Sequence, residues 1–527
     1  MLHSRYLHDP GRRNVDRFSL PTASTANSAR AHLAGWRWYL ATGAIAIALL
    51  SAQAVAESSM PLETVTAQID AGDFRDAEAG IDAALRKPGL DAEVRKALEF
   101  QRERMRRIRL DFPITEAQVK QRLRERIPDL RDDEFAAWKA SNQLEHMVID
   151  GEPFYFARSV SNLFLLNPQA AARRAPPIKP PVNGPMESAN AYHAEAVREA
   201  RATGKHSVAP RRVRVTQSLI VNADAVPAGE TVRAWIPLPR ALPGQQEGLR
   251  FLVSQPAAHR IAPESTLQRT VYLEQPAKAG TPTKFSISYE VTVFGQVNLL
   301  DPEKAQPLRG DELVAKHPEL AAHLGERAPH IVFTDDIRAF SKQVVGDEKN
   351  PYFIARKLFE AVDRIPWAGA REYSTITNIS DYALHAGHAD CGQQTLLLMT
   401  LLRLNGIPAR WQSGWIFSDG DYDNMHDWGW LYLAPYGWVP IDVTFGRLAG
   451  DPDVEWFYLG GLDGYRIAFN DDYSQPFAPP KQHFRSETVD LQRGEVEWRG
   501  GNLYFDKWDY TFQANVGNPQ NIRTSNR

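Results

Sequence analysis

A single cysteine, Cys391, opens an apolar stretch in this 527-residue chain. Asp390 precedes it, leucines dominate as far as Leu402, and the pair Asn405-Gly406 is typical of the end of a helix. We therefore predict a buried helix that begins at Cys391. At such a start, free backbone N–H groups and the positive end of the helix dipole favour the thiolate, the reactive form of cysteine. Because a lone cysteine cannot form an internal disulfide, Cys391 is either a reactive thiol or a small buried side chain.

A histidine and an aspartate follow on two strands that a short turn joins. The strand predicted at 426–433 begins with His426, the strand at 438–442 ends with Asp442, and residues 434–437 are typical of a hairpin turn. Counted from the turn, the two residues lie within a few positions of register. A cross-strand pair at about 5 Å would let the Asp442 carboxylate accept a hydrogen bond from the His426 ring. If the helix start packs beside His426, the three residues form a Cys–His–Asp triad.

Each of these residues also has a simpler interpretation. A histidine in an aromatic strand is usually structural, an aspartate near a strand end usually belongs to the turn, and a buried cysteine is usually inert. Taken together, their order, spacing and local context fit one arrangement, which favours the catalytic interpretation.

Three sequence blocks carry a resemblance to a known family. The first places Cys391-Gly392 at the helix start and ends in Asn-Gly-Ile-Pro-Ala-Arg at 405–410, the second is His426-Asp427-Trp428, and the third runs from Gly437-Trp438 to Asp442-Val443-Thr444. Through these blocks, the segment 330–447 resembles the transglutaminase-like superfamily of papain-fold cysteine enzymes. The chain is similar to bacterial, exported members of that superfamily. The β-sandwich predicted before it is similar to those that often precede this domain in bacterial members.

The resemblance implies nucleophilic acyl chemistry. Cys391 would attack a carboxamide or peptide carbonyl to give a thioester. His426 would accept the thiol proton and later protonate the leaving amine, while Asp442 would fix the imidazole tautomer. The backbone N–H of Cys391 would donate to the oxyanion, with a second donor from upstream.

The resemblance also suggests residues for the wall of the cleft or the oxyanion site. Trp367 and Tyr373 lie before the nucleophile, where family members place an aromatic donor or wall. Gly392 and Trp428 stand next to the predicted catalytic residues and complete this candidate set.

Two other polar clusters have the composition of metal sites. His385, His388 and Asp390 could supply three ligands from one loop, but the same loop must position the helix start. The acidic run 419–423 resembles the start of a calcium loop, but Met425 stands where further features of that loop belong. We therefore expect no metal and no cofactor.

The N-terminus has the pattern of a secretory signal peptide. Arginines precede an apolar run that ends in Ala54-Val55-Ala56, a small-x-small cleavage pattern. We predict a signal peptide over 1–56 and an exported, periplasmic protein; the alternative is an uncleaved N-terminal anchor. No later stretch is apolar enough to cross a bilayer. An unpaired thiol is a liability in an oxidising compartment, so an exported chain must hide Cys391 or use it.

Composition and pattern changes predict an α+β chain of several domains. The net charge of −3 offers no reason to expect nucleic acid as a partner, and 43% hydrophobic residues is typical of globular proteins. We expect a helical region at 57–170 with one helical hairpin, a proline-rich linker and short helix at 171–207, and an antiparallel β-sandwich at 208–300. A papain-like catalytic domain at 325–450 and an aromatic-rich β extension at 451–527 follow.

The sequence thus predicts an exported cysteine acyl-transfer enzyme that acts on amide or peptide bonds of a protein or peptide substrate, with the cell envelope as a candidate location. Hydrolysis is slightly favoured, because water is abundant in an open cleft. Two alternatives stay open: a protein-glutamine amine transferase that cross-links its substrates, and a non-catalytic binding module on the same fold.

Overall fold

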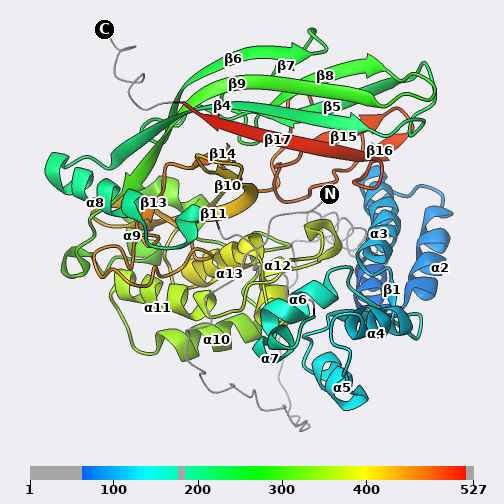
Figure 1. Ribbon diagram of the computed structural model, residues 1–527, viewed down its shortest axis with the longest axis horizontal. Coiled ribbons are helices and arrows are strands. Elements are labelled where there is room, and N and C mark those ends of the chain that lie inside the picture. The colour runs from blue at the N-terminus through cyan, green and yellow to red at the C-terminus, as the bar shows by residue number, and fades with distance from the viewer. Residues whose placement is uncertain (1–61, 176–183, 518–527) are drawn as a thin grey trace, which may run out of the picture. The chain divides into compact units, whose positions relative to one another are not determined.

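The computed structural model describes residues 62–175 and 184–517 (Figure 1). The predicted signal peptide at 1–56 and the proline-rich stretch 176–183 lie outside the described residues. The chain divides into two compact units, one holding the described residues up to 106 together with 148–152, and the other holding 107–147 and everything from 153 onward. None of the described helices is long and apolar enough to cross a membrane.

The smaller unit contains the predicted helical hairpin apart from residues 107–111, which the larger unit holds. Residues 62–71 are helical, α2 spans Phe74–Leu85, and α3 spans Ala92–Asp111. The face that α2 buries repeats at helical spacing, with Phe74, Ala77, Ile81 and Ala84 as its buried residues. The prediction of a hairpin in this region is confirmed.

Short helices and strands follow α3, and all of their residues except 148–152 belong to the larger unit. They are β1 (Ile114–Thr115), α4 (Glu116–Arg124), α5 (Asp132–Ala140), β2 (His146–Ile149), β3 (Glu152–Tyr155), α6 (Ser159–Leu166) and α7 (Pro168–Ala172). The expected all-helical region therefore also holds three short strands, which are too brief for a period-two pattern to show. After the undescribed stretch come the 3-10 turn η1 (Pro185–Glu187) and α8 (Ala191–Thr203).

Two antiparallel sheets form the predicted β-sandwich. The first has the order β13-β9-β4-β17, with β6 also paired to β9, and the second has the order β16-β15-β5-β8-β7. Val213, Val215 and Phe285 of the first sheet and Val232 and Val271 of the second are buried in one core. The strand bounds are β4 (Ser207–Val221), β5 (Thr231–Pro237), β6 (Gln246–Gln255), β7 (Arg260–Ile261), β8 (Thr270–Pro276) and β9 (Thr283–Val297).

The C-terminal segment belongs to both sheets of the sandwich. Its strands are β13 (Gly461–Leu462), β15 (Glu495–Trp498), β16 (Gly501–Leu503) and β17 (Trp508–Val516). β15 pairs with β5, and β17 pairs with β4 from Trp508↔Val221 to Val516↔Val213, as Figure 1 shows by the red strand beside β4. The segment predicted as an extension at 451–527 is therefore part of the sandwich, because backbone pairing between strands far apart in sequence leaves no local pattern.

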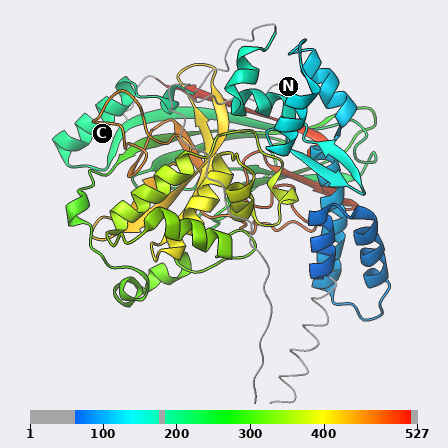
Figure 2. The ribbon, with the colours of Figure 1, turned by 90° about the horizontal axis from the view of Figure 1, so that it is seen from below.

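A four-stranded sheet and a group of helices form the rest of the larger unit. The sheet has the order β12-β11-β10-β14, with β10 (Ala409–Phe417), β11 (Asp423–Leu433), β12 (Gly437–Ile441) and β14 (Arg466–Asn470). The helices and 3-10 turns before it are η2 (Pro302–Lys304), α9 (Gly310–Lys316), η3 (Pro318–His323), α10 (Asp335–Val345), α11 (Pro351–Asp363), η4 (Tyr373–Thr375), α12 (Ile379–His385) and α13 (Cys391–Leu404). Figure 2 shows α10 to α13, in yellow and green, gathered side by side.

Candidate active site

The helix that carries Cys391 begins at the predicted residue. Asp390 caps α13: its Oδ1 accepts from the Gln393 backbone N–H at 3.1 Å, and the Gln393 Oε1 accepts from the Asp390 N–H at 3.1 Å. This capping box fixes the first turn and places Cys391 at the first helical position. Every residue from Cys391 to Arg403 is buried, so the predicted buried helix is confirmed.

The Cys391 thiol donates a hydrogen bond to a carboxylate of the neighbouring sheet. Its Sγ lies 3.1 Å from Oδ2 of Asp427, a residue of β11, and only 9% of the Cys391 residue is exposed. Burial, followed by the charges of Asp427 and Asp390, raises the pKa of the thiol well above its usual value. The expectation that the helix start lowers this pKa is therefore wrong, because burial and two carboxyl groups outweigh the partial charge of the helix end.

His426 and Asp442 form a buried pair. Nε2 of His426 donates to Oδ2 of Asp442 at 2.7 Å, and neither side chain is exposed. Oδ1 of Asp442 accepts from the backbone N–H groups of Thr444 and Phe445, each at 3.2 Å. Arg466 of β14 donates to Oδ2 of Asp442 at 2.9 Å. The structure thus brings these two predicted residues together.

The ionisation of Asp442 follows from these contacts. Burial alone would raise its pKa, but the charges of His426 and Arg466 and their hydrogen bonds outweigh burial and lower the pKa to about 2. Asp442 is therefore a carboxylate at neutral pH, as an acceptor that orients an imidazole must be.

The thiol and the His426 ring lie on opposite faces of β11. Successive residues of a strand project to opposite sides of a sheet. Asp427 faces α13. Gly429 faces it too, because a Cβ added at this glycine would contact Thr395 of that helix. His426 faces the other side together with Trp428, whose indole N–H donates to Oε1 of Gln412 at 2.7 Å.

The expected contact between Cys391 and His426 is therefore replaced by one with the next residue along the strand. Among the described residues, Asp427 is the acceptor for the thiol. The sequence shows that the two strands are adjacent, but which face of β11 meets the helix is set by the packing of α13.

A pocket of about 150 Å³ surrounds the thiol. Trp367 and Tyr373, two of the predicted wall residues, line it with Cys391. Gly392 lies against the Tyr373 ring, and a Cβ at this glycine would stand 2.1 Å from the Tyr373 hydroxyl oxygen. Trp428, the fourth predicted residue, is on the opposite face of β11 and does not line the pocket.

A family profile matches the middle of the chain. The sequence profile of the transglutaminase-like superfamily matches residues 338–443. These residues form a transglutaminase-like domain. It includes α13, the β10–β12 strands and both members of the His426–Asp442 pair.

Comparison with solved structures gives distant similarities, each over about half of this chain. A candidate cysteine protease from Cytophaga hutchinsonii has a TM-score of 0.40 at 16% identity, over 59% of this chain and 91% of that one. The periplasmic domain of TgpA from Pseudomonas aeruginosa has a TM-score of 0.23 at 15% identity, over 50% of this chain and 95% of that one. A candidate protease from Parabacteroides distasonis has a TM-score of 0.19 at 12% identity, over 47% and 48%. No curated protein gives a significant sequence match.

Residues from outside the transglutaminase-like domain complete its pocket, and the sequence analysis missed them. Asp490 and Gln492 lie about a hundred positions after Cys391 and line the same pocket. Nε2 of Gln492 lies 2.9 Å from Oδ1 of Asp427 and 3.0 Å from the His426 carbonyl oxygen. No sequence motif marks Asp490 or Gln492. Asp427 does have a signal in the sequence, because it directly follows His426 in a strand and must project from the opposite face.

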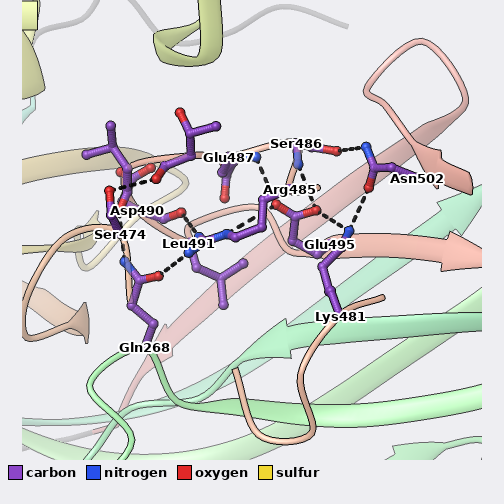
Figure 3. Close-up of polar contacts among 12 residues, drawn as sticks. Gln268, Ser474, Lys481, Arg485, Ser486, Glu487, Asp490, Leu491, Glu495 and Asn502 are labelled. Carbon is purple, nitrogen blue, oxygen red and sulfur yellow. Dashed lines mark hydrogen bonds and ion pairs between the residues drawn. The ribbon is translucent and has the colours of Figure 1, made fainter. Parts of the chain in front are cut away.

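Hydrogen bonds hold the segment that carries Asp490 and Gln492 (Figure 3). Glu495 of β15 accepts from the Ser486 N–H at 2.9 Å and from Nζ of Lys481 at 2.7 Å. Arg485 donates to Oε1 of Gln268 at 2.6 Å. Contacts with the sandwich therefore fix the segment that brings Asp490 and Gln492 to the pocket.

The two polar clusters considered as metal sites point elsewhere. Nε2 of His385 lies 3.0 Å from Oδ2 of Asp336, whereas the buried His388 lies 3.6 Å from Oε2 of Glu145. In the acidic run, Asp419 accepts from the Tyr465 hydroxyl at 2.8 Å. Within residues 62–175 and 184–517, no group of three or more His, Cys, Asp or Glu is placed to hold a metal ion.

Proposed function

We propose that this chain is a cysteine acyl-transfer enzyme that cleaves amide or peptide bonds through a thioester on Cys391. One observation carries the proposal: the only cysteine is the first residue of a buried helix in a transglutaminase-like domain, and its thiol lines a pocket. The sulfur forms a bond to the substrate carbonyl carbon, the carbon–nitrogen bond breaks, and the thiol proton is delivered to the leaving amine. Water or an amine then attacks the thioester and restores the thiol.

The contacts of the thiol support Asp427 as the group that accepts its proton. Oδ2 of Asp427 lies 3.1 Å from Sγ, within reach for proton transfer. Burial, and then the neighbouring Asp490 and Asp390, raise the pKa of Asp427 well above its usual value. A carboxylate with a raised pKa is a stronger base, which brings its proton affinity closer to that of the thiol.

The sequence motif supports a second route for the proton, through His426 and Asp442. The 2.7 Å contact between Nε2 and the Asp442 carboxylate is the contact that a Cys–His–Asp triad requires of its last two members. This route needs the His426 ring to reach the α13 face of β11. Asp427→Asn and His426→Asn discriminate between the routes, because the variant that removes the true base loses the acylation step.

Cys391→Ala and Cys391→Ser test the nucleophile itself. Purified protein is incubated with a panel of peptide amides, and product release is followed together with the mass of the intact protein. A Cys391-dependent acyl adduct with product release supports the proposal. Equal turnover by wild type and Cys391→Ala would overturn it, and binding of a partner without turnover would support the binding module instead.

Hydrolysis is placed ahead of amine transfer because the pocket is lined mainly by polar and charged side chains that admit water. A glutamine peptide with a labelled amine separates the two reactions. Release of ammonia or peptide alone indicates hydrolysis, and incorporation of the label indicates transfer. Both reactions use the same thioester and require no cofactor.

We also propose that the protein is exported to the periplasm, on the basis of the signal-like sequence at 1–56. Cleavage after Ala56 would leave Glu57 as the first residue. Sequencing the N-terminus of the protein from a periplasmic extract tests this, since a retained leader would indicate an anchor.

A further inference from the structure

Three carboxyl groups line the pocket that holds the thiol. Asp390 accepts from the Tyr373 hydroxyl at 2.8 Å and from its cap contact with Gln393. Asp427 accepts from the Cys391 thiol and from Gln492. Both acids line the pocket, and these hydrogen-bond partners are uncharged.

Asp490 is the third carboxyl group, and it has an atom without a donor. Only 5% of this residue is exposed, it lines the pocket, and its Oδ2 receives no hydrogen bond from any described residue. Asp490 and Asp427 shift each other's pKa through a direct side-chain contact. Two carboxyl groups in contact can hydrogen-bond only when one of them holds a proton. A proton shared with Asp427 or a donor on a bound group would satisfy a buried acceptor of this kind beside a pocket.

The cations of the pocket are engaged with other acids. Arg493 donates to both carboxylate oxygens of Glu372, at 2.9 and 2.7 Å, and to Glu487 at 2.6 Å. The guanidinium of Arg371 lies over the Tyr382 ring at 5.0 Å and acts on Glu145 and Asp111. None of these contacts is with Asp390, Asp427 or Asp490, although the charges of Arg493 and Arg485 lower the pKa of Asp490 and the charge of Arg158, which also lines the pocket, lowers that of Asp390.

We propose that Asp490, with Asp427 and Asp390, forms a subsite for an alkylammonium group that the substrate carries next to its scissile amide. An ammonium group supplies three N–H donors and one positive charge in a volume that a pocket of about 150 Å³ accommodates. It would donate to the unpartnered Oδ2 of Asp490 and add a positive charge in direct contact with the three acids. The inference rests on the proposed acyl-transfer function, because it names the class of substrate for the same pocket.

The raised pKa values of the three acids agree with this assignment. Burial is the first cause in each case, and it brings the pKa of Asp390 to about 6. A buried carboxyl group that is costly to ionise is ionised more readily beside a cation.

Paired substrates test the subsite. Peptide amides are compared that differ only in having lysine or Nε-acetyl-lysine beside the scissile bond, on either side of it. We expect kcat/KM for the lysine form to exceed that for the acetylated form by about ten-fold or more. The free energy of one hydrogen bond between charged groups corresponds to about a ten-fold ratio. In Asp490→Asn the ratio of the two values should fall close to one. In Asp336→Asn, a matched change at an exposed aspartate of α10, the ratio should stay that of the wild type.

A binding measurement separates this inference from the proposed function. Nα-acetyl-lysine amide and its Nε-acetylated form are titrated into the Cys391→Ala protein by calorimetry. Tighter binding of the charged form supports the subsite whether or not turnover is found. Equal binding and equal turnover of the two forms would overturn the subsite and leave the acyl-transfer proposal standing. Preferential binding without any Cys391-dependent turnover would overturn the function and not the cation site.

Discussion

Gly392→Ala tests the packing of the helix start against Tyr373. The added Cβ would lie 2.1 Å from the Tyr373 hydroxyl oxygen, 2.6 Å from Cζ and 2.8 Å from Oδ2 of Asp427. Tyr373 must move, and the movement breaks its 2.8 Å hydrogen bond to Asp390. The substitution therefore acts on the two residues that hold the wall of the pocket beside the thiol.

The magnitude follows from opposing contributions. Overpacking a tight site costs about 1–3 kcal/mol. The lost hydrogen bond to a charged group costs about 1.5–3 kcal/mol. Alanine in place of glycine in a helix returns about 1 kcal/mol. We expect a net loss of roughly 1.5–5 kcal/mol in the free energy of unfolding, from the sum of these contributions.

Gly80→Ala is the matched control, and thermal unfolding together with turnover is the assay. Gly80 lies within α2, and a Cβ there would be 3.4 Å from Cγ2 of Val65, which is ordinary contact. The same chemical change should therefore stabilise the smaller unit by up to about 1 kcal/mol. In Gly392→Ala/Tyr373→Phe the loss should be smaller than the sum of the single losses, because the nearest clashing atom is gone. Gly392→Ala with wild-type stability and activity would refute this account.

Three further predictions follow from the charges around the site. Cys391 should react with iodoacetamide at pH 7 more slowly than a cysteine in a short unstructured peptide, because burial and Asp427 raise its pKa; faster reaction would show that the thiolate is favoured. The folded-state pKa of Asp442 is lowered to about 2, whereas its pKa in the unfolded chain is about 3.9. The ionised Asp442 therefore stabilises the fold fully above about pH 3.9, and this stabilisation is lost as the pH falls through 2. Unfolding measured from pH 5 to pH 2 should show less acid destabilisation in Asp442→Asn than in the wild type, and an unchanged profile would contradict this. Arg466→Met should destabilise the protein by about 3–5 kcal/mol in denaturant unfolding, because it leaves Asp442 and Asp463 buried without their shared cation; a loss below about 1 kcal/mol would show that the pair is not maintained in solution.

Local signals predicted the parts of the site that depend on a few consecutive residues. Asp390 and the leucines after Cys391 mark the helix, and the hairpin turn at 434–437 pairs Leu433 with Gly437. The resulting register places Gly429 opposite Ile441, which leaves His426 and Asp442 on the same face and lets them meet at 2.7 Å. Capping, period and turn geometry operate within a few residues, so the sequence carries them directly.

By itself the sequence determined that Cys391 starts a buried helix and that His426 and Asp442 are partners. Only the tertiary structure decided that α13 packs on the face of β11 that presents Asp427, and that Asp490 and Gln492 reach the same pocket from the sandwich side. It also decided the ionisation of the thiol, since burial and the charges of Asp427 and Asp390 outweigh the helix start. The physical reason is that the desolvation and charge at one atom are summed over all the segments around it, whatever their separation along the chain.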